Sequence, residues 1–179
     1  MGMFDNLVLL GESANLVRCA HGHVQEDLQT KSLERLLDVY YVYERVLYRT
    51  MRAAQERIAR SLEMEDDKLR IRFERDASLF AHTGEVVVYT HCKDCDPIVY
   101  ESASSFVGRV SDRRVWVEYE LDFREGRLVK TAALSTKTRE ETREQMLRDG
   151  VAVLPDDDRV ARRHLEMLRK EAETESRDL

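Results

Sequence analysis

Two short clusters of cysteine and histidine, far apart in the 179-residue chain, constrain its fold more than any other feature. The first cluster reads Cys19-Ala20-His21-Gly22-His23, and the second reads His91-Cys92-Lys93-Asp94-Cys95. Together they contain all three cysteines and three of the five histidines. Because three cysteines and one histidine form a common ligand set for structural zinc, we expect the fold to bring the two clusters together around one ion.

The spacing within each cluster favours particular ligands. Cys92-x2-Cys95 allows one tight turn to direct two thiolates at the same ion, and Asp96-Pro97 ends that turn rigidly. A Cys-x3-His loop closes around a tetrahedral ion with less strain than Cys-x-His, and Gly22 permits a sharp backbone turn. We therefore predict a structural zinc ion held by Cys19, His23, Cys92 and Cys95, with His21 as the alternative to His23.

Other interpretations of the cysteines remain open. Free cysteines are often small buried apolar residues without a metal. A redox CxxC of the thioredoxin type begins a helix after a strand, whereas residues 96–100 indicate a turn and then a strand. A catalytic zinc would keep a position for water and need a nearby base, for which sequence proximity alone suggests Glu26, Asp27, Asp94 and Glu101.

Composition and charge argue against several classes of protein. The net charge of −6 makes a whole-surface affinity for nucleic acid unexpected. No apolar run is long enough to span a membrane, and the start MGMFDNLVLLGES lacks the basic segment of a secretory signal. Three cysteines with one CxxC favour metal ligation in a reducing compartment over disulfides. We therefore predict a cytoplasmic protein with no membrane association.

The apolar pattern predicts an α+β protein. Alternation or β-branched runs predict strands over 69–75, 84–91, 115–123 and 128–134, and a short strand over 15–19. The last long pair is joined by a turn with Gly126 in a left-handed conformation. The apolar stretch Leu36–Tyr43 is compatible with a strand or a helix.

Helical spacing of apolar residues predicts an amphipathic helix over 47–64. Two charged helices follow over 138–147 and 157–175, separated by Gly150 and Pro155. The expected fold is a small antiparallel β-sheet with an inserted amphipathic helix and a helical C-terminal arm. We divide it into a zinc-site domain at 1–135 and a charged helical arm at 136–179.

Three short motifs link the chain to other proteins. They are Met1-Gly2-Met3-Phe4-Asp5, the Gln29-Thr30-Lys31 block after the Cys/His knuckle, and the stretch from Trp116-Val117-Glu118-Tyr119 to Gly126-Arg127-Leu128. In these motifs the chain resembles a loose group of small uncharacterised bacterial and phage-encoded proteins. The resemblance covers the two ends of the expected sheet and implies a small domain, metal-binding in some members, without a catalytic residue. Members with a Cys-x2-Cys knuckle differ from residues 19–23 of this chain, so the fourth ligand stays open.

Basic residues form three groups that favour a nucleic-acid alternative. Such groups are usually solvated and paired with nearby glutamates. For nucleic-acid binding they would have to converge on one face. The groups are Arg49, Arg52, Arg57 and Arg60; Arg109, Arg113 and Arg114; and Arg159, Arg162, Arg163, Arg169 and Lys170.

These features predict a non-enzymatic, zinc-stabilised interaction module. We expect a protein partner or a second copy to bind through the helices at 47–64 and 157–175. The first alternative is a zinc-dependent hydrolase or nucleotide-processing enzyme, which an open coordination position facing a pocket with a carboxylate would favour. The second alternative is a nucleic-acid-binding regulator that uses the arginine-rich helices.

Overall fold

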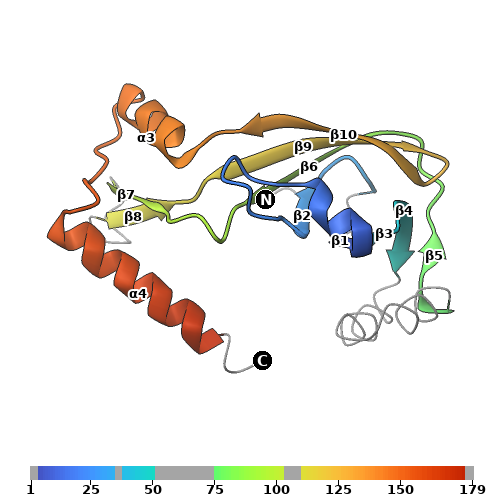
Figure 1. Ribbon diagram of the computed structural model, residues 1–179, viewed down its shortest axis with the longest axis horizontal. Helices are drawn as coiled ribbons and strands as arrows, with labels where there is room; N and C mark the ends of the chain where they lie inside the picture. Colours follow the sequence, from blue (N-terminus) through green and yellow to red (C-terminus); the bar gives the residue numbers. More distant parts are fainter. Residues whose placement is uncertain (1–3, 35–37, 51–74, 103–109, 176–179) are drawn as a thin grey trace. The chain divides into compact units, whose positions relative to one another are not determined.

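The computed structural model describes residues 4–34, 38–50, 75–102 and 110–175 (Figure 1). The chain divides into two compact units. The first comprises Met1–His91 and Trp116–Thr136, and the second comprises Cys92–Val115 and Lys137–Leu179. Within the described ranges, no helix has both the length and the apolar character needed to cross a membrane.

The described residues of the first unit include eight strands and one short 3-10 helix, η1 (Gly11–Leu16). In chain order the strands are β1 (Asp5–Leu10), β2 (Asp27–Thr30), β3 (Val39–Tyr43), β4 (Val46–Thr50), β5 (Ser78–Leu79), β6 (Gly84–His91), β9 (Trp116–Arg124) and β10 (Arg127–Thr136). Seven of them form a closed barrel in the order β10-β9-β6-β2-β1-β3-β4, because β10 also pairs with β4. All barrel pairs are antiparallel except β1 with β3, and β5 extends the sheet beside β4.

Alternation of side chains along the strands fills the barrel. In β6 the inward residues Val86 and Val88 are fully buried, whereas Glu85, which directly precedes Val86, is exposed. Removing such apolar side chains from water supplies the main favourable free energy of folding. The largest fully buried side chains of this unit come from five further strands and the segment after η1: Leu7, Leu9, Val17, Leu28, Tyr40, Val42, Leu47, Leu121 and Phe123.

A two-residue turn joins β9 to β10 and explains the glycine there. Glu125 and Gly126 both have positive φ, 49° and 78°, as a type I′ hairpin turn requires. A Cβ atom at position 126 would lie 2.6 Å from the carbonyl oxygen of Phe80, so a side chain does not fit. The predicted strands over 115–123 and 128–134 and the glycine turn between them are therefore confirmed.

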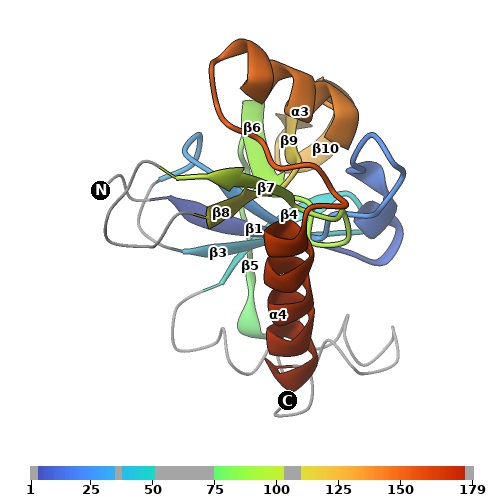
Figure 2. The ribbon, with the colours of Figure 1, turned by 90° about the vertical axis from the view of Figure 1, so that its left-hand side faces the viewer.

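The second unit contains a hairpin of β7 (Ile98–Glu101) and β8 (Val110–Arg113), together with α3 (Arg139–Arg148) and the longer α4 (Arg159–Glu175) (Figure 2). Thr138 begins α3 with a capping box: its hydroxyl accepts from the Glu141 N–H, and Glu141 accepts from the Thr138 N–H. Arg139 donates to both carboxylate oxygens of Asp156, at 2.6 and 2.9 Å, and thereby lowers the pKa of Asp156. The predicted helices over 138–147 and 157–175 are confirmed, with small differences at their ends.

The predicted α+β fold is wrong. The described residues form ten strands and only three helices, and seven strands close into a barrel instead of a small antiparallel sheet with an inserted helix. Local apolar patterns could not reveal this, because the closing pair joins Val46 to Arg127 and the parallel pair joins β1 to β3. Long-range backbone pairing leaves little local signature in a sequence.

The helix predicted over 47–64 is wrong at its start. Residues 47–50 belong to β4, and 51–64 lie outside the described residues. The turn at Glu44 and Arg45, both with positive φ, directs β4 back along β3, so strand pairing overrides the helical spacing. The range Leu36–Tyr43 becomes β3 from residue 39, and 84–91 is confirmed as β6. Of the strand predicted over 69–75, residues 69–74 lie outside the described part of the chain, and Arg75 is helical instead of extended.

Candidate metal centre

The first half-site is the loop at residues 18–24. Arg18 and Val24 pair as an isolated antiparallel bridge, so the loop closes on itself. The Cys19 N–H donates to the His23 carbonyl at 3.0 Å, and the Gly22 N–H donates to the Cys19 carbonyl at 2.9 Å. Gly22 has φ +86°, a left-handed conformation that glycine adopts without strain. The strand predicted over 15–19 is absent here, because residues 15 and 16 end η1.

Hydrogen bonds from two side chains, Arg18 and Tyr119, also hold this loop in place. The Arg18 guanidinium donates to the Gly22 carbonyl at 2.8 Å and to Asn15 Oδ1 at 2.7 Å. On β9, the Tyr119 hydroxyl donates to the Arg18 carbonyl at 3.0 Å. The conformation that presents Cys19 and His23 is therefore fixed by hydrogen bonds of the protein itself.

The second half-site is the turn at residues 92–97, directly after β6. The Cys92 N–H donates to the Val115 carbonyl at 2.9 Å. The Arg114 guanidinium donates to the Lys93 carbonyl, and Arg139 donates to the carbonyls of Asp96 and Pro97 at 3.1 and 3.3 Å. Arginine side chains from other segments therefore bind three carbonyl groups of this turn.

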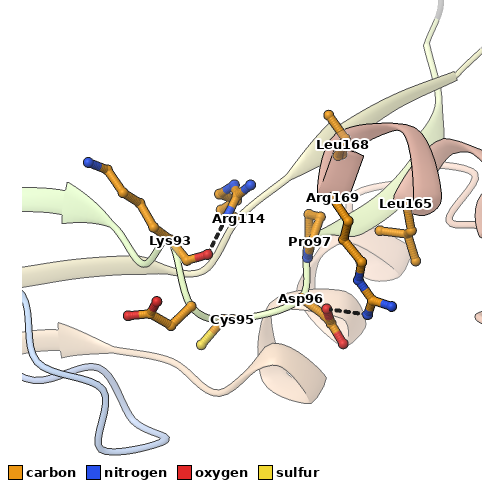
Figure 3. A pocket seen from close by; sticks show the side chains of 9 residues that line it. Lys93, Cys95, Asp96, Pro97, Arg114, Leu165, Leu168 and Arg169 are labelled. Atoms are coloured by element: carbon orange, nitrogen blue, oxygen red, sulfur yellow. Dashed lines mark hydrogen bonds and ion pairs between the residues drawn. The ribbon is translucent and has the colours of Figure 1, made fainter. Parts of the chain in front are cut away.

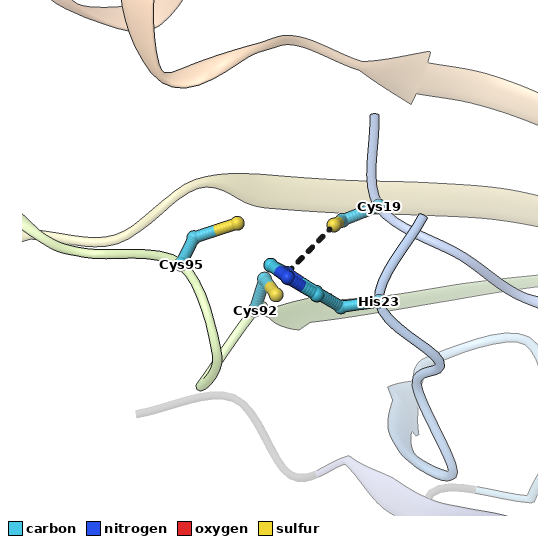
Figure 4. A group of neighbouring side chains, drawn as sticks. All are labelled: Cys19, His23, Cys92 and Cys95. Carbon is cyan, nitrogen blue, oxygen red and sulfur yellow. Dashed lines mark hydrogen bonds between the residues drawn. The ribbon is translucent and has the colours of Figure 1, made fainter. Parts of the chain in front are cut away.

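The structure brings Cys19, His23, Cys92 and Cys95 together (Figure 4). Their ligand atoms all lie within 4.8 Å of one another. The three cysteines are 4%, 0% and 5% exposed, His23 is half-buried, and no disulfide joins the cysteines. This group could hold a metal ion.

One distance allows a sharper test of the geometry. Cys19 Sγ lies 3.5 Å from His23 Nδ1. A tetrahedral zinc ion with bonds of about 2.3 Å to sulfur and about 2.0 Å to nitrogen separates two such ligand atoms by about 3.5 Å. A thiol–imidazole hydrogen bond has a similar length, so the distance fits zinc and is also compatible with a metal-free pair.

The other residues suggested by the sequence lie outside this group. His21 is exposed, and its ring centroid is 6.4 Å from that of His23. The proposed bases Glu26, Asp27, Asp94 and Glu101 are exposed, and the cluster found among the described residues contains none of them.

The basic residues considered for nucleic-acid binding are partly engaged in other contacts. Arg49 forms ion pairs with Glu34 at 2.6 Å and with Asp38 at 2.7 Å. The hydrogen bond to Asp38 raises the pKa of Arg49 above the usual value of an arginine. Arg169 pairs with Asp96 at 3.0 Å. Arg52, Arg57, Arg60 and Arg109 lie outside the described residues.

Sequence reasoning missed the residues that position the ligands. Tyr119 supports the first half-site although it is 101 positions from Arg18 in the chain. Arg114 supports the second half-site from 21 positions away. Neither contact has a local sequence signal, since each depends on which strands become neighbours.

Chemically, the arrangement supplies three sulfur atoms and one ring nitrogen, the number of protein ligands that a structural zinc ion takes. The capacity to hold a metal ion follows from this geometry, whichever family the chain comes from. When the chain was compared with protein-family models, with curated proteins and with solved structures, none of them gave a match.

Proposed function

We propose that this protein is a non-enzymatic binding module stabilised by one zinc ion on Cys19, His23, Cys92 and Cys95. The observation that carries the proposal is the convergence of three thiols and one imidazole within 4.8 Å. Zinc is the metal that this ligand set favours, because it accepts tetrahedral sulfur and nitrogen ligands and has no redox chemistry of its own.

The ligand count supports a structural ion over a catalytic one. Hydrolytic zinc sites use three protein ligands and keep one position for water, whereas four protein ligands close the coordination sphere. The cysteines are also almost completely buried, as in sites that stabilise a fold. Hydrolysis at this ion would require one ligand to leave before a water molecule could bind.

The zinc assignment is tested by a matched pair of variants, His23→Ala and His21→Ala. The two histidines are two positions apart, and only His23 belongs to the cluster. Purified parent protein and His21→Ala are expected to contain one zinc per chain by elemental analysis. His23→Ala is expected to lose most of its zinc, because a site with three ligands binds more weakly.

Two results would contradict the proposal. The first is parent protein that is folded without zinc and unaffected by a chelator. The second is equal zinc content in both variants. Zinc bound with an exchangeable water, together with hydrolysis of a test ester or phosphodiester that His23→Ala abolishes, would favour the enzymatic alternative.

We infer that a second copy of the chain binds to one face of α4. Val160 and Met167 are 52% and 48% exposed and lie one heptad apart, so they share a face, whereas Ala161 is buried on another. Val160→Glu combined with Met167→Glu is expected to abolish dimers in analytical ultracentrifugation. Val129→Glu changes a valine on β10 that is 45% exposed; it is the control and is expected to dimerise like the parent. A parent protein that stays monomeric at all concentrations would overturn this inference.

A further inference from the structure

A cavity of about 130 Å³ borders one cysteine of the cluster (Figure 3). Cys95 lines it, together with an apolar wall of Pro97, Leu165 and Leu168. A water molecule occupies about 30 Å³ in the liquid, so the cavity has room for a molecule the size of hydrogen peroxide. Cys19 and Cys92 are not among the residues that line it.

The charges around the cavity suit a reaction that releases an anion. Its lining includes three cations, Lys93, Arg114 and Arg169, and two carboxylates, Asp94 and Asp96. Arg169 is paired with Asp96 at 3.0 Å, and Arg114 donates to the Lys93 carbonyl. The three cations line the same cavity as Cys95, and their positive charge stabilises the hydroxide as it leaves.

We propose that Cys95 is an oxidation site, at which a hydroperoxide oxidises the cluster and causes release of its metal. The proposal rests on the zinc site proposed above. In the first step the Cys95 thiolate attacks one peroxide oxygen. An S–O bond forms, the O–O bond breaks, and hydroxide leaves while Cys95 becomes a sulfenic acid.

In the second step the Cys92 thiolate attacks the Cys95 sulfur. The S–S bond forms, the S–O bond breaks, and a second hydroxide leaves. The two thiolates lose two electrons in total and the peroxide gains them, so that two water molecules result after protonation.

Cys92 is the resolving thiol because of its position in the same turn. The Cys92 and Cys95 sulfurs are within 4.8 Å of each other, and a disulfide between them closes a short loop. Cys19 lies on a separate loop that its own hydrogen bonds hold in place. Oxidation leaves only Cys19 and His23 as ligands, which is too few to retain zinc.

The first test uses the zinc-loaded parent protein and hydrogen peroxide. We expect release of one zinc per disulfide formed, measured with a chromogenic chelator and by peptide mass spectrometry. The mapped disulfide is expected to be Cys92–Cys95, and a dithiol with added zinc is expected to restore the starting state. A Cys19–Cys95 bond, or zinc retained while Cys95 stays reduced, would overturn the proposal.

The second test fills the cavity without touching a ligand. Leu168→Trp places a larger side chain in the apolar wall, and Leu147→Trp is the control on α3, where Leu147 is 52% exposed. Both variants are expected to bind one zinc. Zinc release by peroxide is expected to be several-fold slower in Leu168→Trp and unchanged in Leu147→Trp.

The outcomes separate this proposal from the one on which it rests. If the parent protein binds no zinc, the proposed zinc site fails. If zinc is bound and equal rates are found for both tryptophan variants, access through the cavity is wrong although the zinc site stands. A sulfenic acid trapped by dimedone on Cys19 instead of Cys95 would also overturn the assignment of the reactive thiol.

Discussion

The two half-sites of the metal centre are held by different kinds of interaction. At residues 18–24 the backbone bonds to itself, through Cys19 to His23 and Gly22 to Cys19, and Arg18 pairs with Val24. At residues 92–97 the carbonyl groups are bound instead by the side chains of Arg114 and Arg139. The first half-site is closed mainly by its own backbone, with Tyr119 as a distant support, whereas in the second half-site arginine side chains bind the carbonyl groups of the turn.

The difference indicates what the metal has to do in each half. A loop that is already ordered loses little conformational entropy when an ion binds. A turn held by long arginine side chains loses more, and the ion then supplies a larger share of its order. We therefore expect the metal to stabilise residues 92–97 more than residues 18–24.

The largest expected effect comes from removing the metal with a chelator. At free zinc about a thousand times the Kd, a site present only in the folded state adds about 4 kcal/mol to the free energy of unfolding. Urea denaturation with and without chelator measures this loss. Hydrogen exchange then tests the difference between the two half-sites. The Cys92 N–H is expected to lose protection, whereas the Cys19 and Gly22 N–H groups are expected to keep theirs.

The control for this prediction is an amide on an element that carries no ligand, such as the Leu47 N–H of β4, which donates to the Gly126 carbonyl at 2.8 Å. Its protection is expected to change only as much as the global stability does. Equal loss of protection at the Cys19 and Cys92 amides would contradict the contrast between the half-sites.

A smaller effect is expected when one arginine contact is removed. Arg114→Ala deletes the donor to the Lys93 carbonyl, and hydrogen bonds of charged groups contribute about 1.5–3 kcal/mol where they are buried. Because Arg114 is half-exposed, we expect zinc to bind about tenfold more weakly, corresponding to about 1.4 kcal/mol. Competition with a chelator of known affinity measures the change.

Arg113→Ala is the matched control for this substitution. Arg113 is adjacent in the chain, carries the same charge and is exposed on β8. Its zinc affinity is expected to equal that of the parent. If both variants weaken binding equally, general electrostatics explains the effect and the role of the Lys93 contact is wrong.

The sequence predicted the long strands and helices of the fold well, and the pairing of the strands poorly. In β6, β9 and β10 the apolar runs and the Gly126 turn are local signals, as are the capping residues Thr138 and Glu141 of α3. Closure of the barrel depends on Val46 meeting Arg127, about which neither segment carries information. The helical spacing of residues 47–64 was misleading because pairing with β3 determines residues 47–50.

For the candidate site, ligand chemistry was easier to predict than ligand geometry. Clustering of scarce residue types identified the two half-sites without any structural information. The choice between His21 and His23 required the path of the loop, which the bridge from Arg18 to Val24 determines. That zinc occupies the cluster stays a prediction until its metal content is measured.

The pairing of β10 with β4 has a consequence for synthesis of the chain. Val46 pairs with Arg127, so the ribosome must synthesise most of the polypeptide before the barrel can close. Until then β9 and the part of β4 that β5 does not cover present open edges, to which other nascent chains can add strands. Cys19 also leaves the exit tunnel of the ribosome long before Cys92 and Cys95 are synthesised, so the complete ligand set forms only later in translation.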